Sequence, residues 1–199
     1  MRVVRVRTPD GKVFLLTKPN EIDQLQKEPK YKYGSTQANI PKDSPASFGL
    51  DLARKRIDYH DVAGQGKDIG GDHVTVRYGI KGDDFEGVRK YLASLAPFEA
   101  TLGKTEKFPP SESSDGAAVI HAPVNSPELA KINAEIQKHA DFVPSNFADY
   151  RPHATVAYVK PDKADKYVGM KVTDGKKFRV SEIAITDRDG NQQVVKLAG

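Results

Sequence analysis

The alternation of apolar and polar positions along the chain predicts short strands interrupted by a few helices. The alternating, strand-like segments are 2–17, 33–40, 73–80, 98–107, 117–124, 153–159, 178–186 and 192–197. Helical spacing of apolar residues, or a good helix start, marks 44–56, 83–95 and 126–140. Ser and Asp residues at the beginnings of these three segments are suited to cap helices. Strands mixed with helices in this order predict an α+β fold.

Residues 1–30 are predicted to form an appendage before the main domain, which covers residues 31–199. Alternating residues on both sides of Pro9-Asp10-Gly11 predict a β-hairpin with an Asp-Gly turn. The polar segment that follows contains Pro19 and Pro29 and has room for a short helix at Glu21–Gln26.

One short pattern occurs twice, in two of the predicted strands. It reads His73-Val74-Thr75-Val76 and, 80 residues later, His153-Ala154-Thr155-Val156. Residues two apart on a strand share a face, so each copy presents an imidazole and a hydroxyl together, and its apolar residues suit the buried face. Thr makes up 9 of 199 residues, so composition alone gives two such His-x-Thr patterns among five His with a probability of roughly 2%. If the fold brings the two strands together, His73, Thr75, His153 and Thr155 form one cluster.

Two imidazoles on either side of a substrate suit the cleavage of a phosphodiester without a metal. Imidazole has an ordinary pKa of about 6.5, so near neutral pH one His can accept a proton while the other donates one. Two Thr hydroxyls can donate to the non-bridging phosphate oxygens. We therefore expect His73, Thr75, His153 and Thr155 to be catalytic, with no metal and no cofactor.

Composition excludes several other classes of protein. The chain has no Cys, which removes disulfides and Cys-ligated zinc and is compatible with the cytoplasm, the expected location. The N-terminus lacks the apolar run of a signal peptide, and no segment approaches a membrane-spanning length, so no membrane partner is expected. The formal charge of +4 would help an anionic ligand to approach, but is too common to indicate nucleic acid by itself.

The paired motifs, together with the lead-in Tyr150-Arg151-Pro152, resemble the 2H phosphoesterase superfamily, which includes the 2′-5′ RNA ligase-like proteins. The resemblance covers roughly residues 31–199 and also includes the opening strand at Ser35-Thr36-Gln37. It implies a bilobal, pseudo-symmetric α+β fold in which two antiparallel sheets face a central cleft, with helices outside. It also implies activity on 2′,3′-cyclic phosphates, 2′-5′ linkages or cyclic oligonucleotides. One phage branch of the superfamily degrades cyclic-nucleotide immune signals of its bacterial host.

Four further residues are candidates for substrate binding, each with an ordinary structural role as the alternative. Arg77 shares the face of His73 and could contact a second phosphate. Tyr33 could stack a base and Gln37 could hydrogen-bond a base edge. Tyr150 could stack a nucleobase or belong to the core.

Other titratable residues are not assigned to the site by the sequence. His60, His121 and His139 lack the motif, and Asp72 points to the other face of its strand by alternation. The basic run Arg54-Lys55-Arg56 is typical of a solvated helix end.

The sequence therefore predicts a metal-independent phosphodiesterase acting on a nucleotide or short oligonucleotide, with no stable protein partner. Two alternatives remain open at this point. One is an RNA-end-binding module of the same fold with little or no turnover, and the other is a structural protein in which residues 1–30 mediate assembly.

Overall fold

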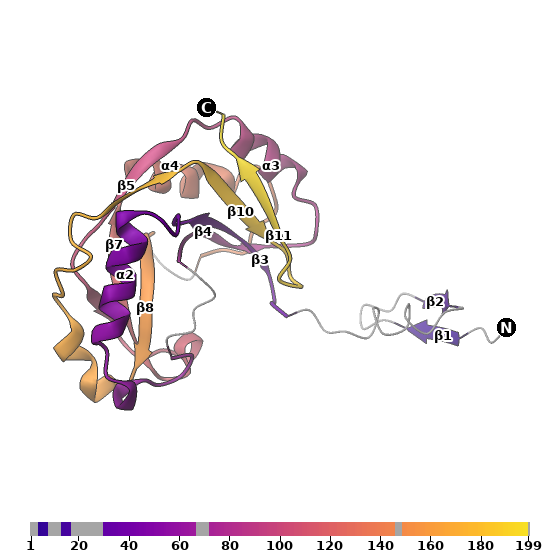
Figure 1. The fold of residues 1–199 in the computed structure, drawn as a ribbon. Helices are drawn as coiled ribbons and strands as arrows, with labels where there is room; N and C mark the ends of the chain where they lie inside the picture. Colours follow the sequence, from indigo (N-terminus) through magenta and orange to yellow (C-terminus); the bar gives the residue numbers. More distant parts are fainter. Residues whose placement is uncertain (1–3, 8–12, 17–29, 67–71, 146–148, 199) are drawn as a thin grey trace.

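The computed structural model describes residues 4–7, 13–16, 30–66, 72–145 and 149–198 (Figure 1). Strands β1 (Val4–Arg7) and β2 (Val13–Leu16) pair antiparallel with Val4 opposite Leu16, as in the predicted hairpin. The expected turn at Pro9-Asp10-Gly11 and the expected helix at Glu21–Gln26 lie outside the described residues. That residues 1–30 are an appendage stays a prediction.

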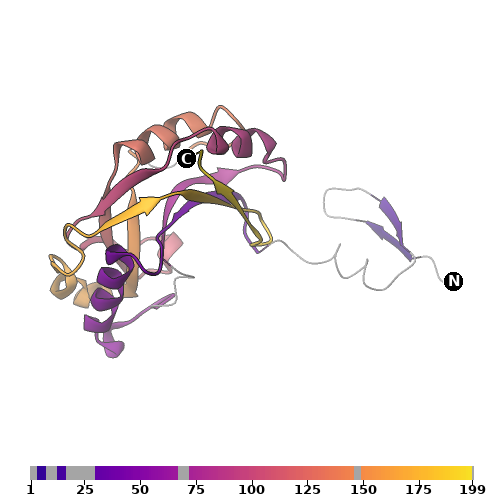
Figure 2. The same ribbon diagram turned by 45° about the horizontal axis from the view of Figure 1, so that its top comes forward.

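The described strands after residue 30 form a curled antiparallel sheet (Figures 1 and 2). They follow the order β11-β10-β3-β4-β8-β7-β5-β9, and β6 pairs with β7 beside this path. Their bounds are β3 Gly34–Asn39, β4 His73–Ile80, β5 Phe98–Leu102, β6 Glu106–Phe108, β7 Ala118–Asn125, β8 His153–Val159, β9 Lys177–Val180, β10 Glu182–Thr186 and β11 Gln192–Lys196. The two motifs therefore begin β4 and β8, the two strands at the middle of the sheet.

The sheet consists of two halves that repeat one arrangement. In the first half β3 leads through helix α2 (Pro45–Arg56) to β4, and in the second β7 leads through helix α4 (Pro127–Ile136) to β8. In each half the two strands pair with one another. The halves meet where Val74 of β4 pairs with Ala154 of β8, so the two expected sheets are joined into one path. The predicted fold class, with its internal pseudo-symmetry, is confirmed.

Helices α2 and α4 start where the sequence predicts, whereas α3 begins at Glu86, after the segment start expected at residue 83; the helices cover the outside of the curl (Figure 1). The Ser44 hydroxyl caps α2 by accepting a hydrogen bond from the Ser47 amide at 3.2 Å, and the Ser126 hydroxyl caps α4 by accepting from the Leu129 amide at 3.3 Å. Pro occupies the first turn of both helices. Helix α3 (Glu86–Ala93) follows β4, and short 3₁₀ segments lie at Tyr59–Asp61, Glu112–Ser114 and Pro161–Tyr167.

Helices α2 and α4 each pack on the motif strand of the half to which they do not belong. Helix α2, from the first half, packs on β8, and α4, from the second half, packs on β4. The residues buried beneath them are the apolar members of the motifs, Val74, Val76, Ala154 and Val156. The helices thus occupy one face of β4 and β8 and leave the other face to the His and Thr side chains.

Two predicted strands are divided in the structure. The segment 98–107 breaks after Leu102 and resumes at Glu106, and its two parts pair with different stretches of β7. The segment 178–186 breaks at Ser181, and its two parts go to different halves, since β9 pairs with β5 and β10 with β3. The C-terminal hairpin is therefore formed by β10 and β11 alone. Alternation predicts strands but not the neighbours with which they pair.

Candidate active site

The alternation within β4 and β8 places all four motif side chains on one face of the sheet. His73, Thr75, His153 and Thr155 are partly exposed, whereas the residues between them are buried. Val and Thr favour extended backbone because their β-branched side chains fit a pleated surface. The buried Val and Ala residues fix which face of each strand turns toward the helices, and so fix the direction of the imidazoles and hydroxyls as well.

The pairing of Val74 with Ala154 brings the two motifs together. In an antiparallel pair the flanking residues run in opposite directions, so His73 lies on the side of Thr155 and Thr75 on the side of His153. Each imidazole of one motif is thus next to the hydroxyl of the other.

His153 is held in one orientation by its own lead-in segment. Its Nδ1 lies 2.8 Å from the carbonyl oxygen of Arg151. A carbonyl can only accept, so Nδ1 carries the proton and Nε2 is the nitrogen left for substrate. Burial is the largest influence on the pKa of His153 and lowers it, the Arg151 carbonyl opposes this, and His73 lowers it further. His153 is therefore biased toward the neutral form, with a lone pair on Nε2.

A third imidazole lies beside this site, and the sequence interpretation missed it. His121 of β7 is opposite Thr155, its ring centroid is 5.2 Å from that of His153, and Phe108 of β6 packs at 3.8 Å from the His121 ring. Phe108 also contacts His153 edge-to-face at 4.8 Å. His121 is 2% exposed, and neither ring nitrogen has a hydrogen-bond partner among the described residues.

The position of His121 depends on a register shift that no local pattern shows. The pairing of β7 with β8 slips between Ile120 and His121, which brings His121 to the face of the motifs. Burial, and secondarily the neighbouring His153, lower the pKa of His121 to about 3. It is therefore neutral near pH 7 and contributes an aromatic wall rather than a charge. The only hint in the sequence is a polar ring inside an otherwise apolar strand.

Two of the predicted substrate residues lie beside the motifs. Gln37 of β3 is opposite Thr75 and therefore on the same face, where its side-chain oxygen accepts a hydrogen bond from Gln192 at 3.3 Å. Tyr150 is near the site as well, but its hydroxyl donates to the backbone carbonyl of Thr75 at 2.9 Å. Burial raises the pKa of Tyr150. The hydroxyl of Tyr150 thus supports the motif strand, and stacking on its ring stays a prediction.

The other two predicted substrate residues, Tyr33 and Arg77, lie toward the end of β4 that is far from His73. Tyr33 precedes β3 and packs edge-to-face on Tyr78, with ring centroids 5.9 Å apart. Tyr78 is five residues from His73, or about 16 Å along a strand, so Tyr33 is at the far end. The guanidinium of Arg77 lies 5.8 Å above the ring of Phe142, and its buried Nε has no hydrogen-bond partner in the described part of the chain. Contact of either side chain with substrate stays a prediction.

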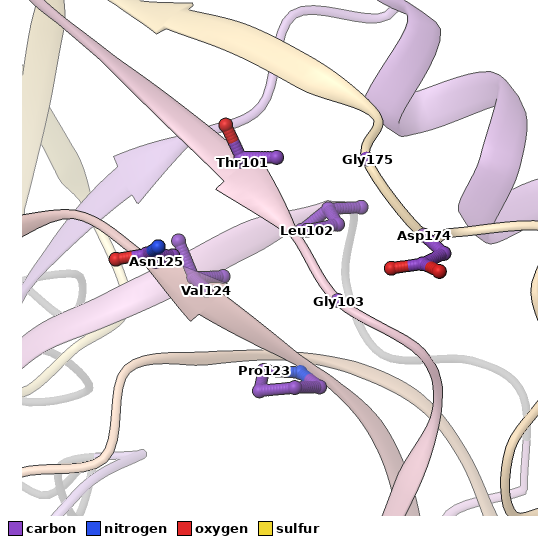
Figure 3. Close-up of a pocket in the computed structure, with 8 residues that line it drawn as sticks. All are labelled: Thr101, Leu102, Gly103, Pro123, Val124, Asn125, Asp174 and Gly175. Carbon is purple, nitrogen blue, oxygen red and sulfur yellow. The ribbon is translucent and has the colours of Figure 1, made fainter.

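A pocket of about 450 Å³ lies one strand from His153 (Figure 3). Pro123 is opposite His153 in the β7–β8 pair, and the Gly103 amide donates to the Pro123 carbonyl at 2.8 Å. The pocket therefore begins beside the site, on strands spaced about 4.8 Å apart. The residues that line it are Thr101, Leu102, Gly103, Pro123, Val124, Asn125, Asp174 and Gly175.

The polar groups of this pocket flank strand β5. Asn125 comes from β7 on one side of β5, and Asp174 comes from the turn before β9 on the other (Figure 3). An amide and a carboxylate together offer both hydrogen-bond donors and acceptors. Groups of this kind are suited to hold a polar ring or a sugar.

Within the described residues, no three His, Cys, Asp or Glu side chains come together as metal ligands. Metal independence is a statement about the reaction and stays a prediction. In the same part of the chain, no helix has the length and apolar character needed to cross a membrane.

A curled sheet with two imidazole–hydroxyl pairs on its central strands defines the class of two-motif phosphoesterase folds. The family described as the 2′-5′ RNA ligase superfamily matches residues 73–192, which is more than half of the chain and contains both motifs. The chain belongs to this superfamily.

Solved structures agree in fold. Kluyveromyces marxianus Usb1 with uridine monophosphate is similar with a TM-score of 0.53 and 13% identity, over 83% of this chain and 98% of that one. The Thermus thermophilus protein TT0787 gives a TM-score of 0.55 and 17% identity, over 82% and 95%. Apo E. coli LigT gives 0.51 and 16%, over 86% and 96%. No curated protein matches the chain by sequence. Family membership supports a phosphodiester-processing activity in general.

Proposed function

We propose that this protein is a metal-independent phosphodiesterase that cleaves a nucleotide or short oligonucleotide by paired imidazole catalysis. The observation that carries the proposal is the pairing of Val74 with Ala154, which brings two His-x-Thr motifs onto one face of the sheet. The substrate diester is a 2′,3′-cyclic phosphate, a 2′-5′ linkage or a cyclic oligonucleotide. The uridine monophosphate in the Usb1 structure supports a nucleotide ligand for this fold.

His153 is the general base in this mechanism. Its Nδ1 proton is donated to the Arg151 carbonyl, and its lowered pKa keeps Nε2 free to accept a proton near neutral pH. Nε2 takes the proton from the attacking oxygen, which is a ribose hydroxyl or a water. As the new P–O bond forms, His73 gives its proton to the leaving oxygen while the old P–O bond breaks.

The hydroxyls of Thr75 and Thr155 hold the phosphoryl group between the two rings. They donate to the non-bridging oxygens, where negative charge accumulates in the transition state. A nucleoside attached to the diester would occupy the nearby pocket, which begins at Pro123 opposite His153, with Asn125 and Asp174 as hydrogen-bonding groups.

The proposal is tested by digesting a panel of substrates in buffer with EDTA. The panel contains 2′,3′-cyclic nucleotides, 2′-5′ and 3′-5′ dinucleotides, and cyclic di- and trinucleotides. The blank is the His73→Ala/His153→Ala double variant, checked for folding by circular dichroism. Cleavage of one class by the wild type alone supports the proposal and identifies the diester.

Equal cleavage by the wild type and the double variant would contradict the proposed mechanism. Loss of activity in EDTA that added metal restores would replace it with a metal-dependent one. If no substrate of the panel is cleaved and the protein binds RNA ends with salt-dependent affinity, a binding module is favoured instead.

A further inference from the structure

Helix α2 carries an arginine that bonds to the backbone of the opposite motif strand. Arg54 donates through Nη2 to the carbonyl of Thr155 at 3.2 Å and through Nε to the carbonyl of Val156 at 3.3 Å. The run Arg54-Lys55-Arg56 was predicted to be a solvated helix end. Lys55 and Arg56 are exposed, as expected, but only 15% of the Arg54 side chain is exposed, so the prediction is wrong for this residue.

The same guanidinium is ion-paired with Asp72, the residue immediately before His73. Asp72 is 8% exposed, points away from the face of His73 as alternation predicts, and also accepts a hydrogen bond from the Ser47 hydroxyl at 2.7 Å. Its backbone carbonyl accepts from the Ile40 amide at 2.9 Å. Arg54 is therefore connected at once to the start of one motif and to the middle of the other.

The second half of the protein has a counterpart on α4. Asn133, which is buried, donates through Nδ2 to the carbonyl of Val76 at 2.6 Å. Val76 and Val156 hold the same place in the two motifs, three residues after the His. Each of the helices α2 and α4 therefore provides one side chain that bonds to the carbonyl at this position in the motif strand of the other half.

These bonds lie where the sheet has little pairing of its own. Strands β4 and β8 share the single registered pair of Val74 and Ala154, whereas β3 with β4 and β7 with β8 pair along most of their lengths. A buried carbonyl without a partner is costly, so side-chain donors are needed where the ladder is short. A planar guanidinium can serve two carbonyls and a carboxylate together, which the ammonium of Lys cannot do in the same geometry.

We infer that Arg54, through its ion pair with Asp72, is a positioning residue that fixes the separation of the two His-x-Thr motifs. The inference rests on the proposed function of these motifs. In the described part of the chain, Arg54 bonds to the backbone carbonyls of Thr155 and Val156 and is ion-paired with Asp72, so it acts through the two strands. A shift of about 1 Å between base and acid can reduce turnover on the order of 10²-fold.

The test uses two substitutions that change charge in opposite directions. Arg54→Met removes a positive charge and Asp72→Asn removes a negative one, but both break the same connection. The matched control is Lys55→Met, which removes an exposed positive charge from the same helix. A positioning role predicts that kcat falls in both test variants, on the order of 10²-fold for Arg54→Met and 10-fold for Asp72→Asn, while Lys55→Met stays within about 2-fold.

Long-range electrostatics predicts the opposite signs for the two test variants, since only Arg54→Met would weaken the attraction of an anionic substrate. Opposite effects on kcat/KM would therefore overturn the inference. Full activity in Arg54→Lys would also overturn the inference, because a positive charge without the planar set of guanidinium donors would then be sufficient. So would a lowered melting temperature in both variants with unchanged kcat per folded molecule, which is the mark of a merely structural role.

A second measurement does not require turnover. Inorganic phosphate is titrated while the imidazole signals of His73 and His153 are followed by NMR. Both signals should respond together in the wild type and in Lys55→Met, and affinity should fall at least about 5-fold in both test variants. If the wild type binds phosphate at both rings but cleaves nothing, the proposed function fails and the positioning role stands. Unchanged phosphate affinity in the test variants would overturn the positioning role.

Discussion

The imidazole of His121 lies 5.2 Å from that of His153, centroid to centroid, and the two rings share Phe108 as a neighbour. A second positive charge at this distance would repel a protonated His153 in a poorly hydrated environment. The fold avoids it by burying His121 so completely that it stays neutral. The wall beside His153 is therefore aromatic but uncharged, and it adds to the burial that favours the neutral form of His153.

The first prediction concerns the pH dependence of stability that His121 imposes. Its pKa is lowered from 6.5 to about 3 in the folded protein, so below pH 6.5 the unfolded chain binds a proton that the folded chain does not. Stability from this group is fully present above pH 6.5 and is lost as the pH falls toward 3. Between pH 7 and 5 we expect His121 to account for about 2 kcal/mol of lost unfolding free energy.

Urea denaturation of wild type and His121→Phe at pH 7 and pH 5 measures this contribution. Phe keeps the ring packed on Phe108 but cannot titrate, so the variant should lose less stability over the interval. An equal loss in both proteins would show that His121 is protonated or solvated in the folded state.

The second prediction concerns the pH dependence of catalysis. The profile of kcat/KM should be bell-shaped, because one imidazole must be neutral and the other protonated. Burial and the charge of His73 lower the pKa of His153, so the acid limb, where the base becomes protonated, should lie below the ordinary imidazole value. The measurement is initial rate against pH at constant ionic strength. A monotonic rise to about pH 9 would speak against a paired base and acid.

The third prediction concerns the two hydroxyls. Thr75→Val and Thr155→Val keep the β-branched shape that suits the strand and remove only the donor. Each should lower kcat/KM on the order of 10²-fold, by the loss of one donor to the phosphoryl oxygens. Folding, checked by thermal melting, should change little because both side chains are on the partly exposed face. Activity within a factor of about two of wild type in both variants would remove the hydroxyls from the mechanism.

Several features of this protein follow from short-range patterns and were predictable. The caps at Ser44 and Ser126 depend on a few consecutive residues, and both helices begin there. The alternation in His73–Ile80 and His153–Val159 is local too, because a strand has a period of two whatever its neighbours are. The four motif residues could also be named as candidates from the sequence, since two rare His-x-Thr patterns in strands indicate a shared role, and that role stays a prediction.

Strand neighbours, by contrast, were decided by the tertiary structure. The alternating run 178–186 gave no sign that its parts join different halves, because the period of two says which residues share a face but not which strand lies alongside. The contacts of Arg54 were hidden for the same reason. An arginine at a helix end looks solvated until α2 is known to cross onto β8.

The sequence by itself determined the four motif side chains and the face of the strand that each occupies, because the chemistry of a side chain and the pleat of its strand are local properties. Only the tertiary structure decided that Val74 meets Ala154, that a register slip brings His121 to His153, and that Arg54 connects the two motifs. These contacts join residues 18 to 102 positions apart, and the packing of the whole core selects them.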